Sequence, residues 1–467
     1  MKILVATKNK GKLKEFVELL KPFDFKILSL DDFNSIEEPV EDGKTLMENA
    51  IIKAFYYYNA FKVPVISDDS GLFVDELFGE PGIYSARYSG KGEKSNREKL
   101  LQKLIGKTNR SAHFECNLVF YDGVEFITSV GSIFGKITEF ERGNNGFGYD
   151  SIFLTDKYNL TMAELDEDIK NSISHRFNAI QGLIFKLNFY LNKINKIDYA
   201  KELYKELVGV EPIEIKLCNA GMSNYTFLLK GIKNLVIRIP GYSSEIFILR
   251  SIELEGLNKV KGNNDFIQYI YYDVLTGVKV SPYIVESNSN LNLNDILNTL
   301  KVLHKMDSFI NDYKPFDRLN YYERLTNILN IKLDNSYYEV LSILNEHKDK
   351  LISRPIVPCH NDCQLSNFIN NVLIDFEFIG NNDPLFDYAC FGNNDISISL
   401  SLVDLDDEIT NKNDAKNTVK LWYSLQALSW YLVALFKART GFSKSTGIDF
   451  EKIAYMFLNK SIDVLNN

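Results

Sequence analysis

Two sets of chemically active side chains lie far apart on this chain of 467 residues and share no segment. The first set runs from Thr7 to Arg176 and the second from His360 to Glu377. Each set combines acidic side chains with basic or amide side chains beside short apolar runs. A single hydrophobic core rarely extends beyond about 250–300 residues. We therefore expect two domains, each with its own core and its own active site.

The composition is that of a soluble globular protein, with 45% apolar and 25% charged residues. The net charge of −9 argues against a general binder of nucleic acid or of anionic membranes. It is compatible with anionic small molecules as substrates, because a local group of Lys, Arg and Mg²⁺ can hold phosphate on an acidic protein.

Five cysteines without a CxxC pair fit a reducing cytoplasm and the absence of structural disulfides. The apolar run at residues 1–6 is too short for a signal peptide, since Lys8, Asn9 and Lys10 follow it directly. No stretch reaches the apolar length that spans a bilayer. The sequence thus predicts a cytoplasmic protein.

Hydrophobic spacing in the first part of the chain predicts a mixed α/β domain. A capping box of Thr45 and Glu48 opens a helix, and Asp122-Gly123 is a turn signal between two strands. The predicted elements are a strand at 3–6, a helix with Leu13, Phe16, Val17 and Leu20 on one face, a helix at 45–60, a strand at 63–67 that ends where Asp68 begins, strands at 117–121 and 125–130, and a largely helical segment at 164–191.

A polar, lysine-rich segment at residues 192–201 separates this domain from the next, and we predict domains at 1–195 and 200–467. The second domain begins with strands and continues with helices, which is the order of a two-lobed α+β domain of the protein-kinase type. Its predicted elements are a helix at 200–207, strands at 213–217, 225–230 and 235–239, helices at 244–260, 291–310 and 318–347, short strands at 356–359 and 372–375, and a long helix that contains Leu421 to Phe436.

The segment from Thr7 to Lys12 lies where the first strand meets the first helix. Backbone N–H groups at a helix start, with a lysine beside them, favour a phosphate. The alternative is that Asn9 only caps the helix and that the lysines are solvated.

Asp68 and Asp69 follow a predicted strand and precede Ser70-Gly71. Two adjacent carboxylates point in different directions, so one can hold Mg²⁺ while the other orients or deprotonates water. Glu41 is a candidate further metal ligand. The alternatives are an Asp-Ser-Gly turn and, for Glu41, a surface acid in an acidic loop.

Residues 146–150, with the sequence GFGYD, combine two glycines that permit close backbone approach with two aromatic rings that could stack on a base. His175 and Arg176 could hydrogen-bond a purine edge. The alternatives are a glycine turn with core aromatics, and a solvated pair on a helix.

These residues resemble the inosine triphosphate pyrophosphatase (Ham1-like) family over about residues 1–195. The motifs that carry the resemblance are TxNxxK, SDDSGL, residues 81–88, GFGYD, and Lys170 ahead of SHR. The resemblance implies Mg²⁺-dependent hydrolysis of ITP, XTP and dITP to the monophosphate and pyrophosphate, by a homodimer. It implies Asp69 as general base and metal ligand, Glu41 and Asp68 as further metal ligands, Thr7, Asn9, Lys12 and Lys53 near the triphosphate, and Ser70, Phe147, Gly148, Tyr149, Asp150, Lys170, His175 and Arg176 around the nucleoside. Ser151 departs from the proline usual in the family, which puts the rigidity of this loop in doubt.

In the second set, Asp362 and Asn367 are five residues apart, and Asp375 follows on a short predicted strand. This order is typical of kinases, in which the first Asp accepts the proton of the substrate hydroxyl while Asn and the second Asp hold Mg²⁺. His360 is expected to orient this loop. We reject a metal site at Cys359, His360 and Cys363, because no fourth ligand lies nearby.

Upstream residues are candidates for the phosphates of ATP. The segment 219–224 lies between two predicted strands, where Ser223 and Asn224 could cover the phosphates. Arg238 could pair with the phosphates because its guanidinium offers a fork of donors, and Glu253 could pair with Arg238.

The second set resembles the choline/ethanolamine kinase family, including LicA-type kinases, over about residues 205–467. HNDCQxxN at 360–367, residues 373–378 and residues 382–389 carry the resemblance. It implies transfer of the γ-phosphoryl group of ATP to choline. A quaternary ammonium needs aromatic faces and carboxylates. The candidates are Glu377, Phe378, Trp422, Tyr423, Trp430 and Tyr431.

The leading interpretation is a bifunctional Mg²⁺-dependent enzyme that acts on small molecules. Two alternatives stay open. The kinase acceptor could be ethanolamine or another small amino alcohol, and one domain could be a regulatory or assembly module, for example through dimerisation of the first domain.

Overall fold

The computed structural model describes residues 1–23, 25–34, 36–218, 224–286, 292–392, 395–441 and 447–466. The chain divides into two compact units, one made of Met1–Asn195 with Tyr242–Ile246 and the other of Lys196–Gly241 with Phe247–Asn467. Each is described by itself. No helix among the described residues has both the length and the apolar content needed to cross a membrane.

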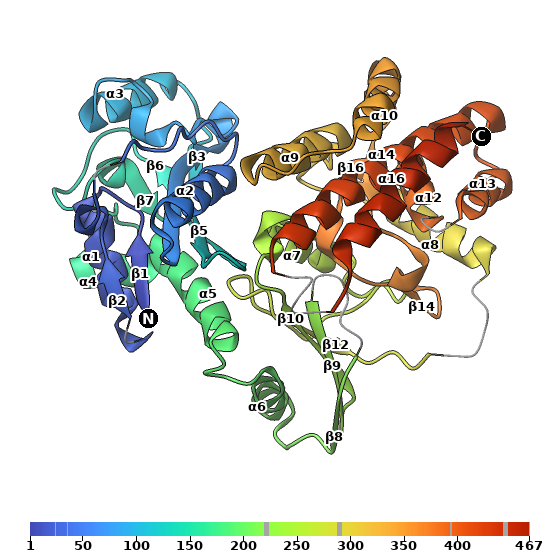
Figure 1. The fold of residues 1–467 in the computed structure, drawn as a ribbon, viewed down its shortest axis with the longest axis horizontal. Helices are drawn as coiled ribbons and strands as arrows, with labels where there is room; N and C mark the ends of the chain where they lie inside the picture. The colour runs from blue at the N-terminus through green and yellow to red at the C-terminus, as the bar shows by residue number, and fades with distance from the viewer. Residues whose placement is uncertain are drawn as a thin grey trace. The chain divides into compact units, whose positions relative to one another are not determined.

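The first unit is built on one mixed sheet in the order β2-β1-β3-β5-β6-β7, with β4 paired to β3 (Figure 1). β1 pairs in parallel with β2 and β3, and the other pairings are antiparallel. α2 packs on β3 and β5, and α5 packs on β5 and β6. The strands are β1 (Lys2–Val5), β2 (Lys26–Leu28), β3 (Val65–Val74), β4 (Pro81–Gly82), β5 (Ser111–Tyr121), β6 (Phe126–Ile137) and β7 (Phe153–Thr155), and the helices are α1 (Lys10–Leu19), α2 (Leu46–Phe61), α3 (Glu93–Lys103), α4 (Glu167–Ile173) and α5 (His175–Tyr190). The predicted mixed α/β class is confirmed.

β3 is longer than predicted, because it continues through the acidic pair instead of ending before it. Asp68 and Asp69 stand opposite Leu118 and Asn117 of β5, so the alternative interpretation of this segment as an Asp-Ser-Gly turn is wrong. A Cβ at Gly71 would lie 2.5 Å from the carbonyl oxygen of Gly82 on β4. Gly71 therefore serves the close approach of two strands and not a turn, and successive residues of β3 point to opposite faces of the sheet.

The predicted helical segment at 164–191 is two helices that meet at Ser174. The Ser174 hydroxyl accepts from the N–H of Phe177 and caps α5, so His175 and Arg176 lie in the first turn of that helix. This turn lies directly on β6, since a Cβ at Gly131 would lie 2.1 Å from Ala179 N and 2.3 Å from the carbonyl oxygen of His175. The absence of a side chain at Gly131 therefore allows the first turn of α5 to lie in direct contact with β6.

The second unit begins with an antiparallel sheet in the order β11-β12-β10-β9-β8, followed by a mainly helical part (Figure 1). α6 packs on β9 and β10, and the long α14 packs against α9, α12 and α16. The sheet consists of β8 (Glu214–Leu217), β9 (Asn224–Lys230), β10 (Leu235–Pro240), β11 (Tyr271–Tyr272) and β12 (Lys279–Pro282). The helices are α6 (Lys196–Val208), α7 (Arg250–Lys259), α8 (Leu293–His304), α9 (Pro315–Ile328), α10 (Asn335–Glu346), α11 (Lys348–Ile352), α12 (Pro384–Phe391), α13 (Ile396–Leu405), α14 (Lys412–Arg439) and α16 (Phe450–Asn466). The predicted two-lobed α+β class is confirmed.

Two short strand pairs, β13 (Val357–Cys359) with β16 (Gly380–Asn382) and β14 (Phe368–Ile369) with β15 (Val372–Leu373), frame the second set of active residues. The predicted helices at 244–260 and 291–310 are shorter in the structure, and the one at 318–347 is two helices, of which the second is capped by Asp334. β11 and β12 escaped the sequence analysis because they have only 2 and 4 residues.

The close contact at Gly131 gives a first prediction. Gly131→Ala should destabilise the first unit by about 2–3 kcal/mol, because the added methyl meets backbone atoms that cannot rotate away. In scanning calorimetry, the unfolding transition of this unit should fall by roughly 5–10 °C. Ser132→Ala, the neighbouring residue of the same strand, is the control and should leave the transition in place. An unchanged transition for Gly131→Ala would show that the helix is not held in this way.

Candidate active sites

A pocket of about 200 Å³ in the first unit brings together most of the residues predicted to hold a nucleotide. Its walls come from the start of α1, the middle of β3, the GFGYD loop and the start of α5. The predicted residues in its lining are Asn9, Lys12, Ser70, Phe147, Gly148, Tyr149, Asp150, Lys170, His175 and Arg176. The lining does not include Thr7, whose hydroxyl accepts from the N–H of Asn9 at 3.2 Å, nor Lys53.

Asn9 caps α1, as the alternative interpretation of this segment proposed. Its Oδ1 accepts from the N–H groups of Gly11 at 2.9 Å and Lys12 at 3.1 Å. The cap leaves the amide end of Asn9 at the pocket and turns Lys12 towards β3. Capping and a place in the pocket wall therefore coexist at this residue.

Asp68 is buried and its Oδ2 lies 2.6 Å from the ammonium of Lys12. Burial alone would raise the pKa of this carboxyl, but Lys12, Arg176 and Lys53 together lower it far below its ordinary value. Ser70 also donates to the same oxygen at 3.2 Å. Asp68 is thus held as a carboxylate at every pH at which the protein works.

The side chain of Asp69 projects to the opposite side of β3, and its ion pair is longer than that of Asp68. Asn49 donates to its Oδ2 at 3.0 Å, and Lys53 lies 3.4 Å from its Oδ1 and 3.4 Å from Glu41. Burial raises the pKa of Asp69 despite the charge of Lys53. The pKa values of the two adjacent aspartates therefore differ. Asp68 stays ionised, whereas Asp69 can take up a proton.

Glu41, Asp68 and Asp69 offer the carboxylate oxygens that Mg²⁺ prefers. In the described part of the chain, their ligand atoms are not among the groups of three that lie within 4.8 Å of one another. Each carboxylate instead lies against a lysine, Asp68 against Lys12, and Asp69 and Glu41 against Lys53. The donor set fits a hard cation, and a cation that binds here exchanges with these ammonium groups.

The far end of the pocket carries polar atoms that are buried without a partner. His175 stacks on Phe114 with ring centroids 5.0 Å apart, and its burial, together with Arg176 and Lys12, lowers its pKa well below the ordinary value. Nδ1 of His175 and Nε of Arg176 have no hydrogen-bond partner among the residues that the structure describes. A neutral imidazole and a guanidinium with unused hydrogen-bonding capacity suit the polar edge of a base.

Of the two aromatic rings in the GFGYD loop, only Phe147 is open to a base. Phe147 is 41% exposed and lies under the ammonium of Lys170, which pairs with Asp150 at 2.6 Å. Tyr149 is buried in a hydrophobic cluster and its hydroxyl donates to the carbonyl of Ser85 at 2.9 Å. The ring of Tyr149 therefore packs as a core aromatic, as the alternative expected, while the residue also lines the pocket.

The sequence analysis missed several residues of this site. Glu15 lines the pocket and pairs with Arg176, while Asn49 supports Asp69 from α2. Glu93 and Arg97 of α3 hold Gly148. Helical spacing was an available signal for Glu15, which lies three residues after Lys12 on the same helix. No sequence signal pointed to Glu93 and Arg97, because α3 contacts the GFGYD loop only in the folded chain.

In the second unit, Asp387 of α12 holds the loop that carries Asp362. Its carboxylate accepts from the N–H groups of His360 at 3.0 Å and Asn361 at 2.7 Å, and His304 lies 2.9 Å from the same group. The side chain of His360 contacts the carbonyl of Ile374 at 2.9 Å, which joins this loop to the segment before Asp375. Backbone and imidazole thus bring the two aspartates of the motif together.

Asp362 is buried, and its Oδ1 has no hydrogen-bond partner within the described residues. Asn367 donates to the carbonyl oxygen of Asp362 at 2.6 Å and to its Oδ2 at 3.3 Å. Burial and the nearby charges of Asp375 and Glu377 raise the pKa of Asp362 well above its ordinary value. The free oxygen and the raised pKa are properties of a group that accepts a proton.

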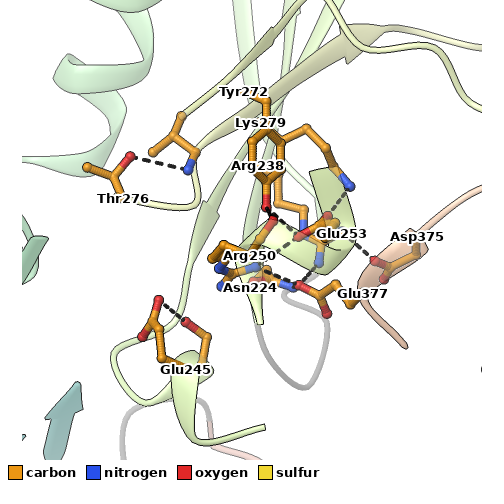
Figure 2. Close-up of polar contacts among 12 residues, drawn as sticks. Asn224, Arg238, Glu245, Arg250, Glu253, Tyr272, Thr276, Lys279, Asp375 and Glu377 are labelled. Atoms are coloured by element: carbon orange, nitrogen blue, oxygen red, sulfur yellow. Dashed lines mark hydrogen bonds and ion pairs between the residues drawn. The ribbon is translucent and has the colours of Figure 1, made fainter. Parts of the chain in front are cut away.

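A cluster of buried charges joins the sheet, α7 and the segment after Asp375 (Figure 2). Arg238 lies 2.5 Å from Asp375 and also pairs with Glu377. Arg250 lies 3.2 Å and Asn224 3.3 Å from the same Glu377 oxygen.

Glu253 belongs to the same cluster and was predicted to pair with Arg238. The residue 2.8 Å from it is Lys279 of β12, and Arg250 and Tyr272 also contact it (Figure 2). Lys279 was missed with its strand. The carboxylates of Glu253, Asp375 and Glu377 converge within 4.8 Å, which fits a divalent cation.

Within the described part of the chain, the residues predicted to bind an acceptor are not gathered in the pocket that Trp422 lines. Trp422 is 1% exposed, and its indole N–H donates to Asp383 at 2.8 Å. It lines a pocket of about 410 Å³ that contains neither Asp362 nor Glu377. Tyr423 and Tyr431 are buried, and Trp430 packs edge-on against Phe378. Ser223, and with it the segment 219–223, lies outside the described residues.

Comparisons with known proteins agree with the division of the chain. Residues 3–186 match the model of the Ham1 family, and residues 259–406 match that of the phosphotransferase enzyme family. The dITP/XTP pyrophosphatase of Bacillus anthracis is 47% identical over 192 residues, which are 40% of this chain and 95% of that protein. The predicted resemblance of the first part of the chain is thereby confirmed.

Solved structures match both parts. The Ham1 protein of Staphylococcus aureus is 40% identical, with a TM-score of 0.38, over 40% of this chain and 98% of its own. The choline kinase LicA of Streptococcus pneumoniae is 20% identical, with a TM-score of 0.48, over 58% of this chain and 98% of its own.

The charge cluster yields a second prediction. Arg238→Met should destabilise the second unit by about 3 kcal/mol or more, because it leaves the buried Glu377 and the partly buried Asp375 without their closest cation. Calorimetry of the full chain should show this as a lower transition temperature for the second unit alone. Lys230→Met is the matched control in the same sheet. Its pair with Glu214 is 43% and 53% exposed and should contribute no more than about 1 kcal/mol. Equal shifts for the two variants would contradict a stabilising role of the cluster.

Proposed function

The chain belongs to the Ham1 family through its first unit and carries a phosphotransferase-family domain in its second, and from this premise we propose a bifunctional enzyme. The first domain hydrolyses ITP, XTP and dITP to the monophosphate and pyrophosphate. The observation that carries this proposal is the pocket whose lining includes Lys12, His175 and Arg176. Among the described residues, one buried nitrogen of His175 and one of Arg176 have no hydrogen-bond partner, and Lys12 pairs with Asp68.

The acidic pair supplies the hydrolytic chemistry. Glu41, Asp68 and Asp69 hold Mg²⁺, which when bound neutralises phosphate charge and acidifies water. Asp69 takes the proton of the water that attacks the α-phosphorus, and its raised pKa suits this role. Thr7, Asn9, Lys12 and Lys53 hold the triphosphate, and Lys12 and Lys53 offset the charge that develops on it.

Selectivity for the base rests on the 6-oxo group of hypoxanthine and xanthine, which adenine lacks. A donor of Arg176 or His175 pairs with that oxygen and is mispaired against the 6-amino group of adenine. Phe147 stacks on the ring, and Ser70, Gly148, Asp150 and Lys170 line the nucleoside. Relatives named dITP/XTP pyrophosphatases support this substrate class.

The second domain transfers the γ-phosphoryl group of ATP to a small alcohol. Asp362 accepts the hydroxyl proton of the acceptor at its unpartnered oxygen, and Asn367 and Asp375 hold Mg²⁺. Arg238 binds the phosphates of ATP, with Glu253, Ser223 and Asn224 near them. Since Arg238 pairs with Asp375 and Glu377 in the structure, the nucleotide competes with these carboxylates for its guanidinium.

We propose choline as the acceptor, with ethanolamine or another small amino alcohol as the alternative. Glu377 and Trp422 are the proposed contacts for the ammonium group, supported by the motif at residues 360–367 and its continuation to Phe378. The protein is further proposed to be cytoplasmic and to form a homodimer through its first domain.

Substitution of the two proposed bases separates a bifunctional enzyme from an enzyme with one regulatory module. Asp69→Asn should lower hydrolysis of dITP at least about 100-fold and leave phosphoryl transfer unchanged, and Asp362→Asn should do the reverse, since each removes a proton acceptor. Pyrophosphate release and ADP formation report the two reactions. Asp122→Asn, in the turn between β5 and β6, is the control for the first domain. Normal hydrolysis by Asp69→Asn would rule out its role as base.

The acceptor is decided by a substrate panel. Purified protein with ATP and Mg²⁺ should phosphorylate choline faster than ethanolamine, other amino alcohols or aminoglycosides, with the phosphorylated product detected directly. A faster reaction with ethanolamine selects the alternative acceptor. ADP formation that is independent of every acceptor would contradict the proposed transfer.

A further inference from the structure

Both main-chain polar groups of Gly148 are held by side chains of one helix. Its N–H donates to Glu93 Oε2 at 2.9 Å, and its carbonyl accepts from Arg97 Nη1 at 2.8 Å. Glu93 and Arg97 are four residues apart on α3, so they project from the same face. Gly148 has a φ of +63°, a conformation that favours glycine, and a Cβ there would meet nothing within 4 Å. The two side chains of α3 therefore fix the peptide groups on both sides of Gly148.

A second pair of side chains braces this contact from outside the pocket. Glu141 forms an ion pair with Arg97, its Oε2 3.0 Å from Nε, although that N–H makes no hydrogen bond to any described residue. The hydroxyl of Ser151 donates to the same oxygen of Glu141 at 2.9 Å. The N–H of Arg142 donates to the carbonyl of Ser151 at 2.8 Å, which closes the two ends of the loop on each other. Ser151 stands where the resembled family usually has a proline. A hydroxyl–carboxylate–guanidinium chain therefore does here what a rigid ring would do through the backbone.

The loop position matters because Phe147 lies between two anchors. Its N–H donates to Asp150 at 3.0 Å on one side, and Gly148 is held by α3 on the other. The ring between them is 41% exposed and lines the pocket. A shift of Gly148 moves this ring relative to His175, which lines the same pocket.

We propose that Glu93 and Arg97, braced by Glu141 and Ser151, form a clamp that positions the Phe147-Gly148 edge of the pocket and thereby sets its affinity for the purine. The inference rests on the nucleotide-binding function proposed for the first domain. Glu141 and Ser151 are positioning residues, because they are absent from the pocket lining and act through Arg97. Binding of the base depends on the clamp, and the attack of water at Asp69 does not.

The test uses the full chain with substitutions at the brace. Glu141→Gln and Ser151→Ala should raise KM for dITP about 3- to 10-fold, the loss of one hydrogen bond or ion pair, with kcat within about 2-fold of wild type. Ser151→Thr keeps the hydroxyl and should restore the wild-type KM. Glu139→Gln, an exposed acid in the same loop, is the control and should change neither constant.

A second measurement avoids turnover altogether. Titration calorimetry with IMP should show weaker binding for Glu141→Gln and Ser151→Ala by the same factor, and amide exchange at Gly148 should be faster in both. Unchanged KM and IMP affinity in both variants would overturn the clamp, as would a fall in kcat without a rise in KM. If the wild-type protein neither hydrolyses dITP nor binds IMP, the proposed function fails and the clamp fails with it. Normal wild-type activity with unaltered variants overturns the clamp alone.

Discussion

Buried carboxylates that carry charge are the constraint on which both units depend, because each needs a cation placed against it by another part of the fold. In the first unit, Lys12 of α1 lies against Asp68 of β3. In the second, Lys279 of β12 lies against buried Glu253 of α7. Arg238 of β10 lies against the partly buried Asp375, which follows β15. An unpaired buried charge costs several kcal/mol, so the helix, strands and loops that bring these partners together cannot move apart freely. The same pairs include residues for which we propose roles in binding phosphate and metal, so one set of residues would serve both stability and chemistry.

Each carboxylate that is stabilised by a cation has a second carboxylate near it whose charged form is stabilised less. Asp69 and Asp362 have pKa values raised by burial, whereas cations lower those of Asp68 and Asp375 despite burial. Pairs of acids whose surroundings separate their pKa values divide the work between holding charge and moving a proton. In β3 the difference in pKa between Asp68 and Asp69 follows from strand geometry, since adjacent residues face opposite sides of the sheet and Lys12 lies on the side of Asp68. In the second unit the raised pKa of Asp362 follows from its burial in the loop that Asp387 fixes and from the nearby charges of Asp375 and Glu377.

Much of the fold was predictable because it follows local patterns. The capping box at Thr45, the turn at Asp122-Gly123 and the sequence of strands before helices in the second domain all have short-range signals, and the structure has the corresponding elements. The errors are of two kinds. β3 was cut short because Ser70-Gly71 looks like a turn, whereas Gly71 is needed for the contact with Gly82 across the sheet. β11 and β12 were missed because strands of 2 and 4 residues are defined by pairing more than by composition.

The sequence by itself determined which residues have the chemistry: the acidic pair, the GFGYD loop, His175-Arg176, and the ordered Asp, Asn and Asp of the second domain. Motif spacing is enough for this, because each group lies on one short segment. Only the tertiary structure decided how these residues are supported. In the folded chain, Lys279 pairs with Glu253, and Arg238 pairs with Asp375 and Glu377. Tyr149 and Trp422 are buried and donate hydrogen bonds. Glu93 and Arg97 bind the main chain of Gly148. The physical reason is that burial and pairing depend on distances between segments far apart in the chain, and these distances exist only after the sheets and helices have packed.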